Sequence, residues 1–438
     1  MTTKHSCALL KELTIQPIMD SRRDNIMMRA FTEQKMKRWA EQRWILDAII
    51  SSVGMEWDQP RLGYTMFPCG PDAVGDFRTV GMRTKKFNDM HREFAAAASR
   101  RQAKAISFEE QDRLVSARES YFIASLLYSA ARWPIFEAND LHIEYNQKMN
   151  DCYDKYIQYA PRPIERVEIP FGDGVLPGYL ALPHAPKDGE KFPCAIGIDG
   201  MDGSKEIMCS MYGDKMLERG MASFVYDGPG QGECPVKGVY VTKDNHMDAA
   251  QAVYDWLIQH PAIDKDRLVI FGLSFGSFFG LQAAAQLGDK VLGTAVTFVC
   301  HEPGCYTIFN MAAPSFKLRF MFMSDYDNED EFDKFISEFS LDPILSDIKS
   351  PVLIQAGQDE ELSPIECTDD VVSKLSVNKK LVYYEGERHA IGGGSAAYFG
   401  ENWYSMLADW CQDRVNGKEA PNEKVLINTM GQQEVTPY

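Results

Sequence analysis

The feature that most constrains this chain is the pentapeptide GLSFG at 272–276, which stands between a strand pattern and a helix pattern. The apolar residues at 268–271 are typical of a buried strand, and the small residues at 277–285 are typical of a buried helix. A G-x-S-x-G sequence in that setting predicts a nucleophile elbow, a sharp turn that raises the serine, Ser274, above the end of a sheet. The glycines on either side are needed because the strand and the helix pass very close to each other there.

The rest of the chain supplies an acid and a histidine in the order that this elbow requires. The strand pattern at 351–357 ends in a glycine and is followed by the acidic turn at 358–361. Of the eight histidines, only His389 comes after that turn, and it lies just beyond the strand pattern at 381–386. We therefore predict Ser274 as the nucleophile and His389 as its general base.

The sequence leaves the identity of the carboxylate open. Glu360 stands three residues after the terminal glycine of its strand and four before a proline, where many hydrolases with this elbow carry the acid. Asp359 is adjacent to it, and aspartate is the commoner residue in the role. Glu302 is a third and more distant candidate.

Catalysis by such a triad also needs two N–H groups that bind the oxyanion of the tetrahedral intermediate. One of them is the backbone N–H after the nucleophile, which belongs to Phe275. The other comes from the loop after an earlier strand. The strand pattern at 194–198 and the glycine-containing loop at 199–203 therefore point to the N–H of Met201.

Three further residues are expected to contact the substrate. Gly200 belongs to the loop of the second oxyanion donor, and His301 and Glu302 follow the strand pattern at 294–300. The ten cysteines are scattered singly, without the paired spacing of a zinc site. We therefore expect neither a metal nor a cofactor.

The hydrophobic pattern divides the chain near residue 162. Residues 1–161 have helical periodicity and are predicted to form a helical N-terminal domain. From 162 to 416, strand patterns alternate with helix patterns, which predicts an α/β fold with a mostly parallel, twisted sheet and helices on both faces. Residues 301–345 interrupt that alternation and are predicted to form a lid, whereas 417–438 are predicted to be a polar tail.

Within the N-terminal domain, large apolar residues recur at helical spacing over 25–55, and a second helical stretch covers 71–105. The sequence SFEE at 107–110 matches a capping box and predicts the start of a third helix. A fourth helix is expected over 139–159, before two prolines.

Charge and targeting signals narrow the classes of partner and compartment. The formal net charge of −17 argues against a nucleic acid or an anionic membrane surface as the main partner. The first residues are charged and polar, and no apolar run approaches the length that spans a bilayer. We expect a cytoplasmic protein that acts on a small molecule, and the sequence leaves a homodimer open.

Two further strings carry a resemblance to a known family. The residues DGMDGSKE at 199–206 and YDGPGQGE at 226–233, together with the elbow, resemble the two-domain α/β-hydrolases typified by 2,6-dihydroxypseudooxynicotine hydrolase. Fungal polyketide-shortening hydrolases and fusarin-type hydrolases belong to the same broad group. The segments at 57–64 and 68–71 resemble the fusarin-type subgroup. The chain departs from these relatives at Glu360, where they carry aspartate.

The resemblance implies a helical cap over the catalytic face, with the active site buried between the two domains. Relatives hydrolyse a carbon–carbon bond next to a ketone, cleave polyketide esters or thioesters, or assist ring closure. We therefore expect a serine hydrolase for a sizeable apolar carbonyl substrate in polyketide or polyketide–peptide metabolism. Two alternatives stay open at this stage: a cyclase that uses the same triad without hydrolysis, and a catalytically silent ligand-binding protein.

Overall fold

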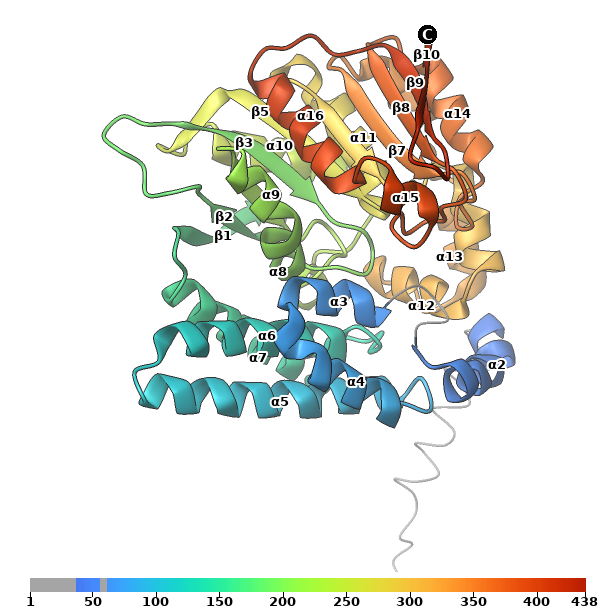
Figure 1. Cartoon of the computed structure of the whole chain (residues 1–438). Coiled ribbons are helices and arrows are strands. Elements are labelled where there is room, and N and C mark those ends of the chain that lie inside the picture. The colour runs from blue at the N-terminus through green and yellow to red at the C-terminus, as the bar shows by residue number, and fades with distance from the viewer. Residues whose placement is uncertain (1–36, 56–60) are drawn as a thin grey trace, which may run out of the picture.

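The computed structural model describes residues 37–55 and 61–438, which form a layer of helices packed against a large sheet (Figure 1). Parts of two predictions, the helix over 25–36 and the family-like segment at 57–60, lie outside the described residues. The N-terminal helices, which we call the cap, lie below the sheet in Figure 1, with α8 and α12 at the boundary. The cap helices are α2 Lys37–Val53, α3 Arg61–Cys69, α4 Val74–Arg83, α5 Asp89–Glu110, α6 Leu114–Arg132 and α7 Asp140–Gln158.

The cap is joined to the sheet by a shared apolar core. Helix α6 is buried along most of its length, because it packs on α5 and α7 on one side and faces the sheet on the other. Phe122, Leu126 and Tyr153 of the cap belong to the same core as Tyr179 of the sheet, and the rings of Tyr153 and Tyr179 are 4.6 Å apart. The two layers therefore bury each other's apolar surface.

One helix boundary in the cap differs from the prediction. The capping box at 107–110 does not begin a helix, because α5 continues through it to Glu110. The chain turns only at 111–113, where Asp112 has a φ of 56°, and α6 begins at Leu114. Ser107 lies inside α5, and its carbonyl accepts a hydrogen bond from the side chain of Gln111. A four-residue capping pattern does not start a new helix where the residues before it already form one.

The sheet has ten strands in the order β1-β2-β4-β3-β5-β6-β7-β8-β9-β10. Strands β3 to β9 are parallel to one another, whereas β2 pairs antiparallel with β1 and β4, and β10 pairs antiparallel with β9. This arrangement confirms the predicted α/β-hydrolase type of sheet. The strands are β1 Ile164–Phe171, β2 Gly174–Ala181, β3 Phe192–Ile198, β4 Ala222–Tyr226, β5 Ile263–Leu273, β6 Thr294–Thr297, β7 Val352–Gly357, β8 Lys379–Tyr384, β9 Glu423–Ile427 and β10 Gln433–Pro437.

Helices cover the sheet and connect its parallel strands, as right-handed crossovers require. The central helix, α11, follows β5 directly and is almost entirely buried. The helices between the strands include α8 Lys205–Ile207, α9 Gly213–Glu218, α10 Asn245–Leu257, α11 Phe275–Leu287, α14 Ile365–Lys374, α15 Ser395–Phe399 and α16 Trp403–Val415. None of the helices in the described part of the chain has the length and apolar character needed to cross a bilayer.

The segment between β6 and β7 forms an insertion where the sequence predicts a lid. It contains the helices α12 Pro314–Met323 and α13 Glu329–Ile336. Its aromatic rings pack on one another and on Phe275, with Phe320 and Phe275 centroids 4.7 Å apart. These rings are therefore core residues, and their apolar character is explained by packing. Arg38 of α2 donates hydrogen bonds to the carbonyls of Phe309 and Ala312, so the cap also holds the insertion.

The C-terminal segment differs from the polar tail predicted for 417–438. Strand β9 pairs in parallel with β8, and β10 closes this edge of the sheet (Figure 1). Val425 and Ile427 of β9 are buried, whereas every residue of β10 is exposed. An edge strand such as β10, with both faces exposed, needs few apolar residues, and the sequence of this segment is therefore polar.

The shared core predicts that the sheet cannot keep its structure without the cap. Removal of residues 1–161 should leave the fragment 162–438 aggregated, because the surface covered by Phe122, Leu126 and Tyr153 becomes exposed. Size-exclusion chromatography and thermal unfolding of the fragment, beside the full chain, measure this. A monomeric fragment with cooperative unfolding would contradict the prediction.

Candidate active site

The turn between β5 and α11 has the geometry of a nucleophile elbow. Ser274 lies in the turn with φ 58° and ψ −125°, a strained conformation for a residue with a side chain. A Cβ at Gly272 would overlap the carbonyl oxygen of Gly276, and a Cβ at Gly276 would overlap the carbonyl oxygen of Ile198. Both glycines are therefore required for the strand, the turn and the helix to pack this closely.

The structure brings Ser274, His389 and Glu360 into one chain of hydrogen bonds. The Nε2 atom of His389 is 3.0 Å from the Oγ atom of Ser274. The Nδ1 atom of His389 is 2.9 Å from one carboxylate oxygen of Glu360 and 3.0 Å from the other. The side chains of His389 and Glu360 are almost fully buried. This is the order of contacts in which a carboxylate orients an imidazole toward a serine hydroxyl.

The surroundings of His389 set the direction of its pKa. Burial works to lower it, but the adjacent Glu360 carboxylate, together with the charges of Glu361 and Asp202, outweighs burial and raises the pKa of His389. Glu361 also accepts a 2.8 Å hydrogen bond from the backbone N–H of His389, and Glu360 accepts one from the backbone N–H of Leu362. Imidazole and carboxylate are therefore held by the loops as well as by each other.

The other two candidate acids have different surroundings. Asp359 is exposed at the surface, directly before Glu360 in the turn. Glu302 accepts hydrogen bonds from the backbone N–H and the hydroxyl of Thr307, at 2.7 and 3.1 Å, and so stabilises the start of a helical turn in the insertion. Of the three candidates, Glu360 is the one that contacts His389.

The contacts that the structure gives His301 and Glu302, which were expected to bind the substrate, are not with triad residues. The ring of His301 contacts the Thr368 hydroxyl of α14 at 3.2 Å, and its burial lowers its pKa to about 3. It lines a separate pocket of about 250 Å³ beside α14. The chain turns after β6 at Phe298, which has a φ of 56°. After this turn the side chain of Cys300 contacts Ser274, whereas the ring of His301 faces α14.

Residues that the sequence did not single out stand near His389 instead. The ring of Phe298 is 6.1 Å from the ring of His389 and 4.6 Å from that of Trp403. Trp133, which follows α6 of the cap, donates a 2.8 Å hydrogen bond to Asp202. Asp202 in turn contributes to the raised pKa of His389. A positive-φ residue after a strand and a tryptophan at a helix end are weak signals, so only the fold reveals these contacts.

The loop after β3 lies against the nucleophile. A Cβ at Gly200 would approach within 2.8 Å of the Cβ atom of Ser274, so only glycine fits. Met201 is buried next to it, and its carbonyl accepts a 3.1 Å hydrogen bond from Arg319 of the insertion. Phe275 is the first residue of α11, where backbone N–H groups have no partner within their own helix. The predicted oxyanion donors therefore belong to the two segments that flank Ser274.

The first residue of that loop, Asp199, is partly buried. Burial raises its pKa to about 8; the backbone N–H of Gly200, 2.7 Å from a carboxyl oxygen, opposes the shift, and the charges of Asp227 and Asp202 add to it. Asp199 is therefore mostly neutral at pH 7. Among the described residues, no three histidine, cysteine, aspartate or glutamate side chains gather in a way that could hold a metal ion.

The raised pKa of Asp199 predicts a pH-dependent stability. The unfolded chain loses this proton near pH 4 and the folded chain near pH 8, so the free energy of unfolding falls as pH rises through that window. Asp199→Asn should remove the effect, worth up to about 1.4 kcal/mol per pH unit. Urea unfolding from pH 5 to 8 measures it, with Asp188→Asn at an exposed position as the matched control. A difference between Asp199→Asn and wild type that stays constant with pH would contradict the prediction.

The comparisons with known proteins agree with the fold. The family model described as "Esterase FrsA-like" matches residues 77–324, which is more than half of the chain. The chain is 31% identical to the α/β-hydrolase xenA of Xenoacremonium sinensis over 49% of its own length and 52% of that protein. It spans about a third to a half of the length of the first curated relatives that it matches.

Two further similarities cover more of the chain. It is 26% identical to the 2,6-dihydropseudooxynicotine hydrolase of Paenarthrobacter nicotinovorans, over 72% of this chain and 84% of that protein. The crystal structure of the 2,6-dihydroxy-pseudo-oxynicotine hydrolase superposes with a TM-score of 0.70 at 22% identity, covering 82% of this chain and 97% of the other. The predicted resemblance to this group of hydrolases is thereby confirmed, cap included.

Proposed function

The chain belongs to the FrsA-like esterase family of α/β-hydrolases, and from that premise we propose that it is a serine hydrolase with Ser274 as its nucleophile. The observation that carries the proposal is the line of contacts from Ser274 through His389 to Glu360, at 3.0 and 2.9 Å. A serine hydroxyl is a weak nucleophile at neutral pH, and this arrangement is the one that activates it.

In the proposed reaction, Ser274 Oγ attacks a substrate carbonyl while His389 takes its proton. The negative charge that develops on the carbonyl oxygen is bound by the backbone N–H groups of Phe275 and Met201. Collapse of this intermediate expels the leaving group, which receives the proton from His389, and leaves an acyl group on Ser274. Water, deprotonated by His389, then releases the acid in a second addition and collapse. Glu360 holds the imidazole tautomer and stabilises the imidazolium in both halves.

The bond that is cleaved follows from the leaving group, and we propose an ester, a thioester or a carbon–carbon bond next to a ketone. All three react through the same tetrahedral intermediate. Phe298 packs beside His389, and Trp133 of the cap binds Asp202 in the loop beside the nucleophile, so aromatic side chains near the site support a substrate with a sizeable apolar part. A role in polyketide or polyketide–peptide metabolism stays a prediction from the resemblance.

Ser274→Ala should abolish hydrolysis while leaving the melting temperature near that of the wild type. Loss of the nucleophile in a serine hydrolase lowers kcat on the order of 10⁶-fold. Release of 4-nitrophenolate from a 4-nitrophenyl ester measures it, and Ser373→Ala, at an exposed serine, is the control. Folded Ser274→Ala protein with undiminished turnover would contradict the covalent mechanism.

For the natural substrate, the mass of the product distinguishes hydrolysis, in which the product gains water, from cyclisation, in which it does not.

Glu360→Gln should lower kcat by on the order of 10³-fold or more, because a neutral amide neither fixes the tautomer nor stabilises the imidazolium. Asp359→Asn, one residue away and exposed, should stay within about threefold of the wild type. Since Glu360 raises the pKa of His389, the residual activity of Glu360→Gln should have its acid limb at lower pH. Profiles of kcat/KM against pH for both variants test this. The opposite ranking would transfer the role to Asp359.

A further inference from the structure

The loop at 199–205 is held by residues from three other parts of the fold. Arg319 of the insertion binds the carbonyl of Met201 at 3.1 Å. Trp133 of the cap binds Asp202, and Ser129 of the cap lies 3.4 Å from Ser204, hydroxyl to hydroxyl. The third part is the turn at 227–233, which carries the DGPGQGE sequence. The sequence predicts no catalytic role for this turn.

The contact between that turn and the loop is made by Gln231. Its Nε2 atom donates hydrogen bonds to the carbonyl of Asp199 and, at 2.9 Å, to the carbonyl of Gly200. The carbonyl of Gly200 and the N–H of Met201 belong to one peptide unit. All peptide bonds in the described ranges are trans, and in a trans peptide these two groups point in opposite directions. A side chain that holds the Gly200 carbonyl therefore also determines where the Met201 N–H points.

The chemistry of the position favours glutamine. The Oε1 atom of Gln231 accepts a 2.9 Å hydrogen bond from the backbone N–H of Gly228, while its Nε2 atom serves the two carbonyls. An amide offers a donor and an acceptor at the same time, whereas an ionised carboxylate offers acceptors only. Gln231 is buried, so each of these backbone groups would lose its partner without access to water.

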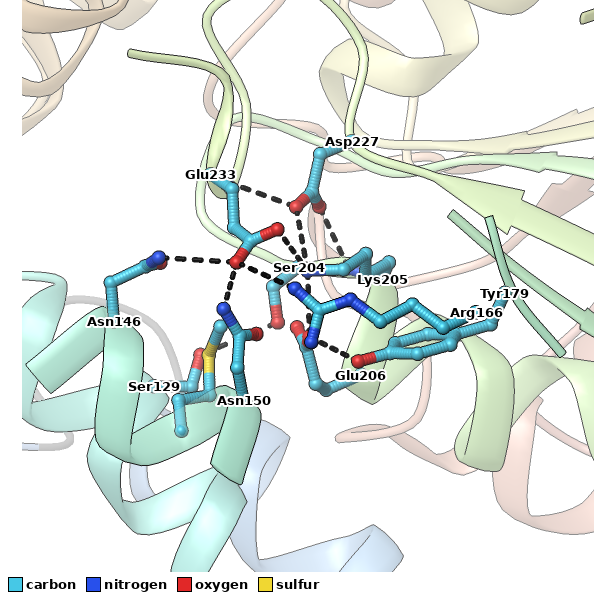
Figure 2. A network of polar contacts seen from close by, with 12 residues as sticks. Ser129, Asn146, Asn150, Arg166, Tyr179, Ser204, Lys205, Glu206, Asp227 and Glu233 are labelled. Atoms are coloured by element: carbon cyan, nitrogen blue, oxygen red, sulfur yellow. Dashed lines mark hydrogen bonds and ion pairs between the residues drawn. The ribbon is translucent and has the colours of Figure 1, made fainter. Parts of the chain in front are cut away.

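The turn that carries Gln231 is anchored by buried charges (Figure 2). Asp227 accepts hydrogen bonds from the backbone N–H of Lys205 at 2.9 Å and from its ammonium group at 3.1 Å. Glu233, at the other end of the turn, accepts hydrogen bonds from Asn146 and Asn150, which lie one helical turn apart on α7. The turn that carries Gln231 is therefore bound to both the 199–205 loop and the cap.

We propose that Gln231 is a positioning residue, which holds the Gly200–Met201 peptide so that its N–H faces the oxyanion of the reaction. This inference rests on the proposed function, since it assigns Met201 as an oxyanion donor. It gives the DGPGQGE sequence a mechanical role: its two acids fix the turn, and its glutamine sets one peptide plane beside the nucleophile. Without Gln231, the loop would be free to turn this peptide and present a carbonyl oxygen, which repels the oxyanion.

The test is the rate at which a fluorophosphonate labels the full chain, because the phosphoryl oxygen of this probe occupies the oxyanion position. Gln231→Met keeps the length of the side chain and removes its amide. We expect a fall of about 10²-fold or more in the limiting rate of labelling, with the half-saturating probe concentration changed less than about threefold. Gln282→Met is the matched control, because Gln282 is also buried and donates to a backbone carbonyl, that of Lys243, away from Ser274.

A conservative variant keeps the test decisive if Gln231→Met folds poorly. In Gln231→Glu a protonated carboxyl can donate to the Gly200 carbonyl, and an ionised one cannot. The labelling rate of this variant, divided by that of the Gln282→Met control, should rise as the pH is lowered, which a purely structural role does not predict. Labelling of both Gln231 variants at the control rate at every pH would overturn the proposal.

The outcomes also separate this inference from the proposed function. If the wild type is not labelled, or is labelled at a residue other than Ser274, the proposed function fails and the inference fails with it. If the wild type is labelled at Ser274, Ser274→Ala is not, and the Gln231 variants react like the control, the serine mechanism stands and Gln231 has no positioning role.

Discussion

A buried ammonium group joins the parts of this molecule that have to meet at the active site. Lys205 is fully buried, and its Nζ atom lies 2.7 Å from Glu206, 3.1 Å from Asp227 and 3.3 Å from Glu233. Burial of that many charges is costly unless they neutralise one another, and loss of one partner leaves the others uncompensated. Burial works to lower the pKa of Lys205, but the three carboxylates outweigh it and keep the ammonium charged. The loop after β3, the turn after β4 and the cap helix α7 consequently share one electrostatic centre, and a displacement of any one disturbs the other two.

This centre connects the cap to the loop beside the nucleophile, although the cap supplies no triad residue. The cap reaches the loop beside Ser274 directly, through Trp133 and Asp202, and indirectly, through Glu233 and the turn that contains Gln231. Polar contacts of this kind fix the orientation of the two layers, whereas the apolar core around Tyr179 stabilises their association. The two kinds of contact act differently because apolar burial is strong and non-directional, whereas hydrogen bonds between buried groups tolerate few alternative geometries.

The sequence predicts the parts of the site that local geometry imposes. The elbow follows from two glycines between a strand and a helix, and the position of His389 follows from strand order, so both could be read without a structure. The choice of Glu360 over Asp359 could not, because neighbouring residues in a turn point in different directions that only the three-dimensional path defines. The contacts of His301 with Thr368 and of Glu302 with Thr307 could not be predicted either, because they depend on the path of the chain after β6. The edge strand β10 was missed because all of its residues are exposed and carry little apolar signal, and β9 was missed because only two of its five residues are buried.

The acidic residues of the 199–205 loop and of the 227–233 turn are protonated, hydrogen-bonded or paired with a cation. A negative charge beside an oxyanion hole opposes the charge that forms there. Asp199 avoids this conflict because its raised pKa leaves it mostly uncharged at neutral pH. Asp202 receives the indole N–H of Trp133, and Asp227 and Glu233 face Lys205. The carboxylates near the nucleophile are thus neutral, hydrogen-bonded or paired with a cation. Among the residues on which His389 depends, Glu360 is the one whose charge the proposed reaction uses, because it lies on the side of the imidazole away from the oxyanion.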